Sequence, residues 1–332
     1  MHPHPEEEES VVVREQAVRV ACGLHQERGD RPYQEDRLCV DECVRTPESE
    51  GDESACFAGC FDGHGGSHCS LFLQQHLLRM LTAGNGPWAH NVKRSLISAF
   101  GRADEHFLSS GDSSGSTALV CLVLNQNVWL ANAGDCRAVL FSNNRSHQLT
   151  RDHCPSDARE RARVERSGGT ILHINERHLL FCGLVHHKRQ IMSRILPSGL
   201  SVARALGDSR VKEAIPGAVV PAPDVFCWSL TSLDEFLILA SDGVFGAGGG
   251  GMSNAEACSV VRDACRSGDS NEEAHETAKR AARYLVRRAV ESARSLGREA
   301  DNCSAIVLIM VHPQSSHDRT SHASHGSKSS RF

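Results

Sequence analysis

Phe61-Asp62-Gly63-His64-Gly65-Gly66 directly follows a short apolar run at residues 55–60. Small and β-compatible residues that run into Asp-Gly predict a buried strand that ends in a tight turn. Asp62 would then lie at the tip of that strand, where the glycines let a metal or a ligand approach the main chain closely. Asp-Gly is also a common hairpin-turn signal, so this stretch alone leaves a simple turn as an equal alternative.

The composition is that of an ordinary globular protein, with 332 residues of which 40% are hydrophobic. A formal net charge of −5 provides no basic surface of the kind that nucleic-acid-binding proteins use, so we expect no nucleic-acid partner. Residues 1–14 are interpreted as a flexible acidic leader without the features of a secretory signal, and no apolar run is long enough to span a bilayer. We therefore expect no membrane partner and a cytoplasmic location, and the sequence does not separate the cytosol from the nucleus.

The 14 cysteines contain no C-x-x-C pair, and many of them lie inside apolar runs. This spacing predicts small buried thiols in a reducing compartment. It disfavours both a disulfide framework and a structural zinc site, because each of these has a recognisable cysteine spacing.

Hydrophobic periodicity predicts the main elements of the chain. Helical spacing is found at residues 70–81, 96–108, 157–167, 254–267 and 271–295. Strand patterns are found at residues 119–124, 128–132, 137–141, 235–240 and 303–311. The first three of these strands predict an antiparallel meander with Asp135 in one of its turns. Residues 170–199 are interpreted as an irregular basic insertion, and residues 313–332 as a disordered tail, because that tail has no core-forming residues.

Acidic residues recur at predicted strand ends that are widely separated along the chain: Glu35, Asp36, Asp62, Asp242 and Asp301. Converging carboxylates repel one another unless cations lie between them, and sites with only oxygen ligands suit hard ions such as Mg²⁺ or Mn²⁺. Two such ions can activate a water molecule for attack on phosphorus. The pattern predicts a two-metal site, whereas the cluster of Arg31, Glu35 and Asp36 on its own would be interpreted as an exposed charge cluster.

The motifs that carry these acids occur in the order seen in the metal-dependent Ser/Thr protein phosphatases of type 2C, the PPM family. The chain resembles that family from about residue 15 to residue 312, which would form the catalytic domain. The motifs are Arg31-x-x-x-Glu35-Asp36, Asp62-Gly63-His64-Gly65-Gly66, Gly115-Ser116-Thr117-Ala118, Ala131-Asn132-Ala133-Gly134-Asp135-Cys136-Arg137, Leu200-x-x-x-Arg204-Ala205-Leu206-Gly207-Asp208, Ser241-Asp242-Gly243 and Asp301-Asn302.

The resemblance implies an α+β fold, in which a central β-sandwich of two antiparallel sheets is flanked by helices. It also implies two Mg²⁺ or Mn²⁺ ions in each active site. Their ligands would be the side chains of Glu35, Asp62, Asp242 and Asp301 and the backbone carbonyl of Gly63.

The same resemblance implies roles in catalysis for three further residues. Arg31 would bind the substrate phosphate, and Asp36 would hold the waters bound to the metals. His64 would act as the general acid that protonates the departing Ser or Thr oxygen, and a water between the two metals would be the nucleophile. A hydrogen-bonded structural histidine is the alternative interpretation of His64.

Two features depart from the family pattern. Gly246 stands where the family has an acid that, together with the residue matching Asp135, helps to hold a weak third metal. The resemblance therefore leaves a third site at Asp135 open. Residues 170–199 form a flap-like insertion that is longer and more basic than usual, for which a solvated loop is favoured over a site for acidic partners. Arg204 and Asp208, in a motif near this flap, are interpreted as a structural ion pair.

The sequence thus predicts a monomeric Mg/Mn-dependent phosphatase that acts on phosphoserine and phosphothreonine in proteins. The alternative is a catalytically weakened relative that binds phosphoproteins as a regulatory module. Such a relative would have lost some of the metal ligands, and this chain has the complete set. Gly246 is the one feature that favours the regulatory alternative. A metal-dependent nuclease is a distant third, because the acidic balance of the chain disfavours a polyanionic substrate.

Overall fold

A computed structural model describes residues 18–45, 54–83, 88–176, 190–246, 251–267 and 272–311. The predicted leader, the predicted tail and the central part of the insertion, including residues 186–189, lie outside these ranges. Across the described residues, no helix combines the length and the apolar character that crossing a membrane requires.

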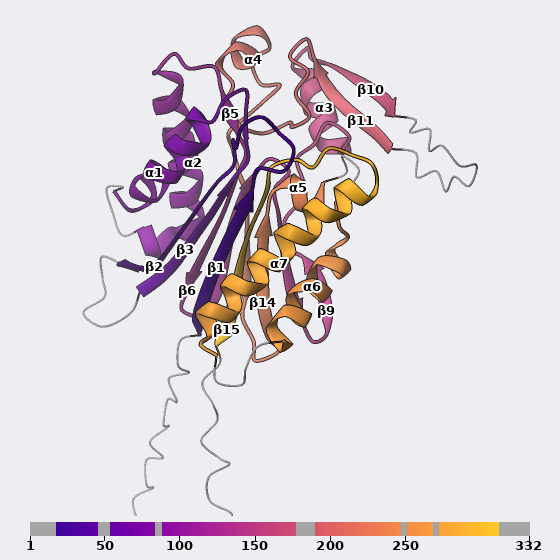
Figure 1. Cartoon of the computed structure of the whole chain (residues 1–332). Coiled ribbons are helices and arrows are strands. Elements are labelled where there is room, and N and C mark those ends of the chain that lie inside the picture. The colour runs from indigo at the N-terminus through magenta and orange to yellow at the C-terminus, as the bar shows by residue number, and fades with distance from the viewer. Residues whose placement is uncertain are drawn as a thin grey trace, which may run out of the picture.

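Two five-stranded antiparallel sheets form the centre of the molecule (Figure 1). The first sheet has the strand order β1 (Arg19–Glu27), β15 (Cys303–Val311), β14 (Asp234–Ala240), β8 (Arg137–Ser142) and β9 (Arg145–Gln148). The second has the order β13 (Asp224–Ser229), β7 (Asn127–Ala133), β6 (Ala118–Leu124), β3 (Ser54–Phe61) and β2 (Arg37–Arg45).

Alternating side chains of each central strand enter two different cores. In β3, Cys56 and Ala58 face the interior between the sheets, whereas Phe57 and Phe61 face the helices on the outside. Successive residues of a strand point to opposite faces, so a strand covered on both sides is apolar along its whole length. This explains the uninterrupted apolar run before Asp62.

A pair of helices covers the outer face of each sheet (Figure 1). The first pair is α1 (His68–Thr82) and α2 (Val92–Leu108), which pack on the second sheet, with the short η1 (Trp88–Asn91) before α2. The second pair is α6 (Asn254–Arg266) and α7 (Ala274–Ser295), which pack on the first sheet. The buried face of α7 is rich in alanine, so this helix lies very close to β1: a Cβ at Gly23 would be 2.1 Å from the Ala278 backbone.

The predicted meander is only partly correct. Strands β6 and β7 pair as expected, but β8 pairs with β9 and β14 in the other sheet. The turn after β7 therefore crosses from one sheet to the other. Gly134 allows this crossing, because its φ is +128° and a Cβ there would lie 2.4 Å from Cβ of Thr117. The crossing places Asp135 at one end of the sandwich.

The flap-like insertion is regular where it is described. Strands β10 (Thr170–Glu176) and β11 (Gln190–Leu196) form an antiparallel hairpin, so the prediction of an irregular segment is wrong for these residues. Ile195 packs with Val164 of α3 (Ala158–Arg166) in a small separate core. A short period-two pattern in a basic segment does not stand out against its polar neighbours, which is why the sequence did not reveal this hairpin.

A small three-stranded sheet lies at the same end of the sandwich as this hairpin (Figure 1). Its order is β12 (Leu206–Gly207), β5 (Gly115–Ser116) and β4 (Gly63–His64). Two short helices follow strands directly, α4 (Ser209–Ala214) after β12 and α5 (Asp242–Phe245) after β14. These short elements carry the residues of the candidate site.

Candidate metal centre and active site

Three aspartates from distant parts of the chain meet at this end of the sandwich. Asp62 follows β3, Asp135 lies in the turn between β7 and β8, and Asp242 begins α5. One carboxylate oxygen from each lies within 4.8 Å of the other two. Both sheets contribute to the cluster, because β3 belongs to the second sheet and β14, which leads into α5, belongs to the first.

Burial and mutual repulsion make this carboxylate cluster unfavourable in its ionised form. Burial, followed by repulsion from Asp36 and Asp242, raises the pKa of Asp62 well above its usual value. Burial and the charge of Asp242 do the same for the pKa of Asp135. Burial and the charge of Asp301 raise the pKa of Asp242 to about 6.

The cluster fits a hard divalent cation. Oδ1 of Asp135 is buried and has no hydrogen-bond partner among the residues that the structure describes. A cation between the carboxylates would remove their repulsion, and oxygen-only ligands suit Mg²⁺ or Mn²⁺. Asp62 and Asp242, two of the predicted metal ligands, therefore lie in one carboxylate group, and Asp135, named for a third site, lies in the same group.

Asp36 is a buried carboxylate near this cluster. Its side chain is 1% exposed, and Oγ of Ser241 donates a hydrogen bond of 3.0 Å to Oδ2 of Asp36. Burial raises the pKa of Asp36 to about 7, against the opposing effect of its serine hydrogen bonds. Ser241 is in turn held by the backbone N–H of Ser304, which donates to Oγ of Ser241 at 3.1 Å.

Glu35 approaches the cluster from the loop before β2. The backbone N–H of Gly66 donates to Oε1 of Glu35 at 2.6 Å, and Oγ of Ser70 donates to the Glu35 carbonyl. Gly63 packs against the same peptide, because a Cβ at Gly63 would lie 2.4 Å from the Glu35 carbonyl oxygen. Glu35 is not one of the three carboxylates that meet within 4.8 Å.

Arg31 and Asp301 contact each other at the rim of the site. Nη2 of Arg31 donates to Oδ2 of Asp301 at 2.6 Å, and the two side chains are 53% and 39% exposed. Asp301 also lies outside the three-carboxylate group. The sequence predicted a role for each of these residues, but not that they would be partners.

Asn302 is a structural residue of the site that the sequence analysis named only as part of a motif. Its Nδ2 donates to the carbonyls of Arg28 and Tyr33 at 2.8 and 3.0 Å, and its Oδ1 accepts from the N–H of Glu35 at 2.8 Å. One buried amide therefore holds the loop that carries Arg31 and Glu35. The signal available in the sequence was an Asn directly after an acid and before a buried strand.

His64 lies on β4, two residues after Asp62. Its Nε2 is 2.9 and 3.0 Å from the two carboxylate oxygens of Asp208. The predicted ion pair between Arg204 and Asp208 is therefore wrong. Arg204 instead binds Glu160 and Asp224, with nitrogen–oxygen distances of 2.7 and 2.8 Å.

Gly246 closes α5 with no room for a side chain. A Cβ at Gly246 would lie 2.2 Å from the carbonyl oxygen of Asp242 and 3.3 Å from its Cβ. A side chain at this position, where the resemblance implies an acid, would therefore meet backbone in close contact.

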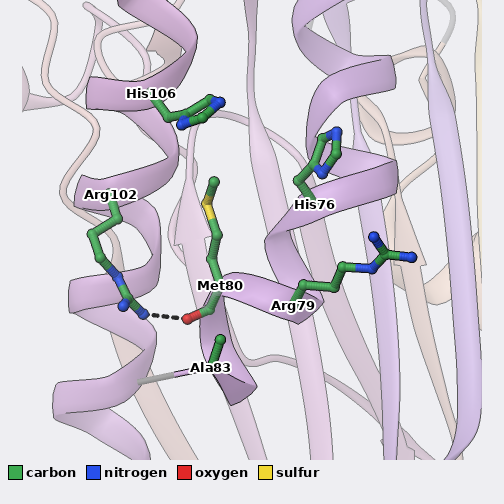
Figure 2. Close-up of a pocket in the computed structure, with 6 residues that line it drawn as sticks. All are labelled: His76, Arg79, Met80, Ala83, Arg102 and His106. Atoms are coloured by element: carbon green, nitrogen blue, oxygen red, sulfur yellow. Dashed lines mark hydrogen bonds between the residues drawn. The ribbon is translucent and has the colours of Figure 1, made fainter. Parts of the chain in front are cut away.

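A surface hollow of about 340 Å³ lies elsewhere, between α1 and α2. Figure 2 shows Arg102 reaching from α2 to the carbonyl of Met80 near the end of α1. None of the predicted site residues lines this hollow, whose lining residues are His76, Arg79, Met80, Ala83, Arg102 and His106.

Comparison with known proteins identifies the family. The family model described as Protein phosphatase 2C matches residues 20–295, most of the chain. The chain belongs to the protein phosphatase 2C family. Among its relatives, Probable protein phosphatase 2C 27 of Arabidopsis thaliana is 30% identical over 290 residues, which are 85% of this chain and 67% of that protein. Probable protein phosphatase 2C 57 of Oryza sativa subsp. japonica is 34% identical over 229 residues, 65% of this chain and 57% of that protein.

Solved structures confirm the protein phosphatase 2C fold. A serine-threonine phosphatase 2C from Toxoplasma gondii has a TM-score of 0.67 and 20% identity, with 90% of this chain and 96% of that chain covered. The structure of a C. elegans sex determining protein has a TM-score of 0.66 and 24% identity, with 87% and 64% covered. The predicted sandwich of two antiparallel sheets flanked by helices is confirmed.

Proposed function

We propose that this protein phosphatase 2C family member hydrolyses phosphoserine and phosphothreonine in proteins and requires Mg²⁺ or Mn²⁺. The observation that carries the proposal is the meeting of Asp62, Asp135 and Asp242 within 4.8 Å, in a chain of this family. The raised pKa values of all three carboxyls support the proposal, because positive charge would favour their ionised forms. Phosphoproteins would be the partners, and the protein would act as a monomer.

The carboxylate cluster and its neighbours would hold two metal ions. Asp62 and Asp242 would be ligands, together with Glu35, Asp301 and the carbonyl of Gly63, and Asp135 would add a ligand for a third ion. When bound, the metal supplies positive charge that neutralises the carboxylates and lowers the pKa of a coordinated water.

Three residues of the chain would bind the substrate or act in its hydrolysis. The exposed guanidinium of Arg31 can bind two phosphate oxygens at once, and its contact with Asp301, another proposed ligand, supports this role. Asp36, which is buried near the cluster, would accept hydrogen bonds from water inside the site. His64 would donate a proton to the departing Ser or Thr oxygen, a step typically worth about 10²–10⁴-fold in rate.

A regulatory phosphoprotein-binding module is the second candidate. The observation in its favour is Gly246, where tight backbone contacts exclude the acid found in the family. A protein of this kind would bind metal and phosphoprotein without turnover.

The deciding experiment measures phosphate release from a phosphothreonine peptide as Mn²⁺ or Mg²⁺ is titrated. Asp62→Asn removes one charge from the cluster, and we expect it to abolish turnover and to weaken Mn²⁺ binding measured by calorimetry. Asp263→Asn is the matched control, because Asp263 is exposed on α6. Metal-dependent turnover in the wild type and in the control supports the phosphatase. A folded wild type that binds Mn²⁺ without releasing phosphate would leave the regulatory module.

A further inference from the structure

His64 and Asp208 are brought together by the three-stranded sheet. His64 ends β4 and pairs with Gly115 of β5, while Gly207 of β12 pairs with Gly115 from the other side. Asp208 follows directly after β12. The two residues are 144 positions apart in sequence, and the register of this small sheet sets them side by side.

The space between them depends on the absence of a side chain at Gly115. A Cβ at Gly115 would lie 2.3 Å from Nε2 of His64 and 2.4 Å from Oδ2 of Asp208. Any larger residue would occupy the point where the imidazole and the carboxylate meet. The Gly-Ser-Thr motif of the sequence thus has a physical role next to His64.

The backbone of Asp208 is held in an unusual conformation that aims its carboxylate at His64. Its φ is +56°, in the left-handed region that non-glycine residues rarely adopt. Asp208 stands at the N-cap position of α4, yet its side chain makes no capping hydrogen bond. Strained backbone of this kind persists where the surrounding structure demands it, often at functional sites.

Lys212, on the helix that follows Asp208, pairs with another carboxylate. Nζ of Lys212 is 2.6 Å from Oδ1 of Asp104, and the N–H of Gly207 donates to the same oxygen at 2.8 Å. The Asp208 residue is 5% exposed, and among the residues that the structure describes its carboxylate binds only the His64 side chain. The carboxylate of Asp208 is therefore dedicated to the imidazole.

This contact determines the roles of the two ring nitrogens. A carboxylate only accepts, so Nε2 carries a hydrogen and donates it to Asp208. Nδ1 of His64 has no hydrogen-bond partner in the part of the chain that the structure describes, and the side chain is 26% exposed. Nδ1 is thus the nitrogen that remains for a substrate.

We propose that Asp208 is the positioning residue for His64: it holds Nε2–H so that Nδ1 delivers the proton to the leaving oxygen of the phosphorylated Ser or Thr. This inference rests on the proposed phosphatase function. In the reaction, the bond from phosphorus to the Ser or Thr oxygen breaks while a water oxygen bonds to phosphorus. Before the step the ring carries a hydrogen on both nitrogens. The leaving oxygen takes the Nδ1 proton, the neutral ring keeps its Nε2 proton, and the water loses a proton to solvent.

The test compares two substrates with different leaving groups. An alkoxide from phosphothreonine needs a proton as it departs, whereas the phenolate from p-nitrophenyl phosphate leaves without one. We expect Asp208→Asn, which keeps the size and tolerates a positive φ, to lower kcat on a phosphothreonine peptide by about 10- to 100-fold. On p-nitrophenyl phosphate we expect a loss of less than about threefold.

Three comparisons make the test specific. His64→Gln should show the same substrate pattern, and the double variant should be no slower than His64→Gln alone, because Asp208 acts through His64. Glu42→Gln breaks another carboxylate–histidine contact of 2.9 Å, with His275 on α7, and should leave both rates unchanged. In nuclear magnetic resonance spectra, the ring N–H signal that His64→Gln removes should shift in Asp208→Asn.

The outcomes separate this inference from the proposed function. If the wild type is active, two results would overturn the role of Asp208 alone. One is an Asp208→Asn variant with an equal loss of kcat on both substrates, and the other is an unshifted His64 ring N–H signal in that variant. A wild type that is inactive on both substrates with Mn²⁺ present would overturn the proposed function and this inference together.

Discussion

Gly246 stands where the resemblance to the family implies an acid. The geometry around Gly246 explains why its replacement by an acidic residue is expected to change the stability of the protein. The N–H of Gly246 closes α5 on the carbonyl of Asp242, and the backbone of Gly251 also approaches it closely. A side chain here would have to displace backbone, which adjusts at a higher cost than the end of a flexible side chain.

Gly246→Asp is therefore expected to destabilise the protein by about 1–3 kcal/mol and to leave the Mn²⁺ concentration for half-maximal turnover unchanged. Thermal unfolding and a Mn²⁺ titration of phosphate release would measure both quantities. Gly101→Asp on α2 is the control, since a Cβ at Gly101 meets nothing within 4 Å. A Gly246→Asp variant that is as stable as the wild type and needs less Mn²⁺ would show that the third site can be rebuilt.

At the scale of elements, ion pairs join α3 to the sandwich. Glu160 of α3 is 3% exposed and lies 2.7 Å from Arg204 and 2.8 Å from Arg163. Arg204 also forms an ion pair with Asp224 on β13. Although burial acts to raise it, the pKa of Glu160 is lowered, because the hydrogen bonds from Arg204 and Arg163 outweigh that effect.

Glu160→Gln should cost about 3 kcal/mol of unfolding free energy, because it removes the carboxylate that pairs with Arg163 and leaves Arg204 with Asp224 alone. Denaturant unfolding at neutral pH measures this loss. A lowered pKa means that Glu160 stabilises the fold above its unfolded pKa, so the difference between variant and wild type should shrink as the pH falls below about 4. Glu165→Gln, exposed on the same helix, should change stability by less than about 0.5 kcal/mol. Equal losses in the two variants would contradict the assigned role of the buried pair.

At the scale of the whole molecule, the sandwich concentrates negative charge at one end. Asp36, Asp62, Asp135 and Asp242 come from both sheets and from the turns between them, and all four have raised pKa values. Each therefore binds its proton more tightly in the folded protein than in the unfolded chain. Their ionisation opposes folding unless a cation is bound.

Without metal, stability should consequently fall as the pH rises through about 6 to 7, the values to which the pKa of Asp242 and of Asp36 are raised. The contribution of these carboxyls is fully present below their unfolded pKa and is lost above the folded one. Melting temperatures in a chelator at about pH 5 and pH 8 would show this fall, and Mn²⁺ should remove it by binding only the folded state. A melting temperature in chelator that is equal or higher at pH 8 would contradict the prediction.

Local patterns in the sequence predicted many of the elements, although not the β10–β11 hairpin, and they supplied the candidate residues. The strand before Asp62 and the helix after Gly66 follow from the spacing of apolar residues, because that spacing records which faces of an element are buried. The order of the motifs predicted the family and with it the sandwich. The acids Asp62 and Asp242 were named for the same cluster in which the structure places them.

Tertiary structure was needed to determine which of these residues are partners. Asp135 joins Asp62 and Asp242 because the chain crosses between sheets at Gly134, and Asp208 meets His64 instead of Arg204 because of the register of β4, β5 and β12. Periodicity shows that a side chain is buried but not what it is buried against. Contacts between residues far apart in sequence depend on how the sheets pair and pack, and no local pattern carries that information.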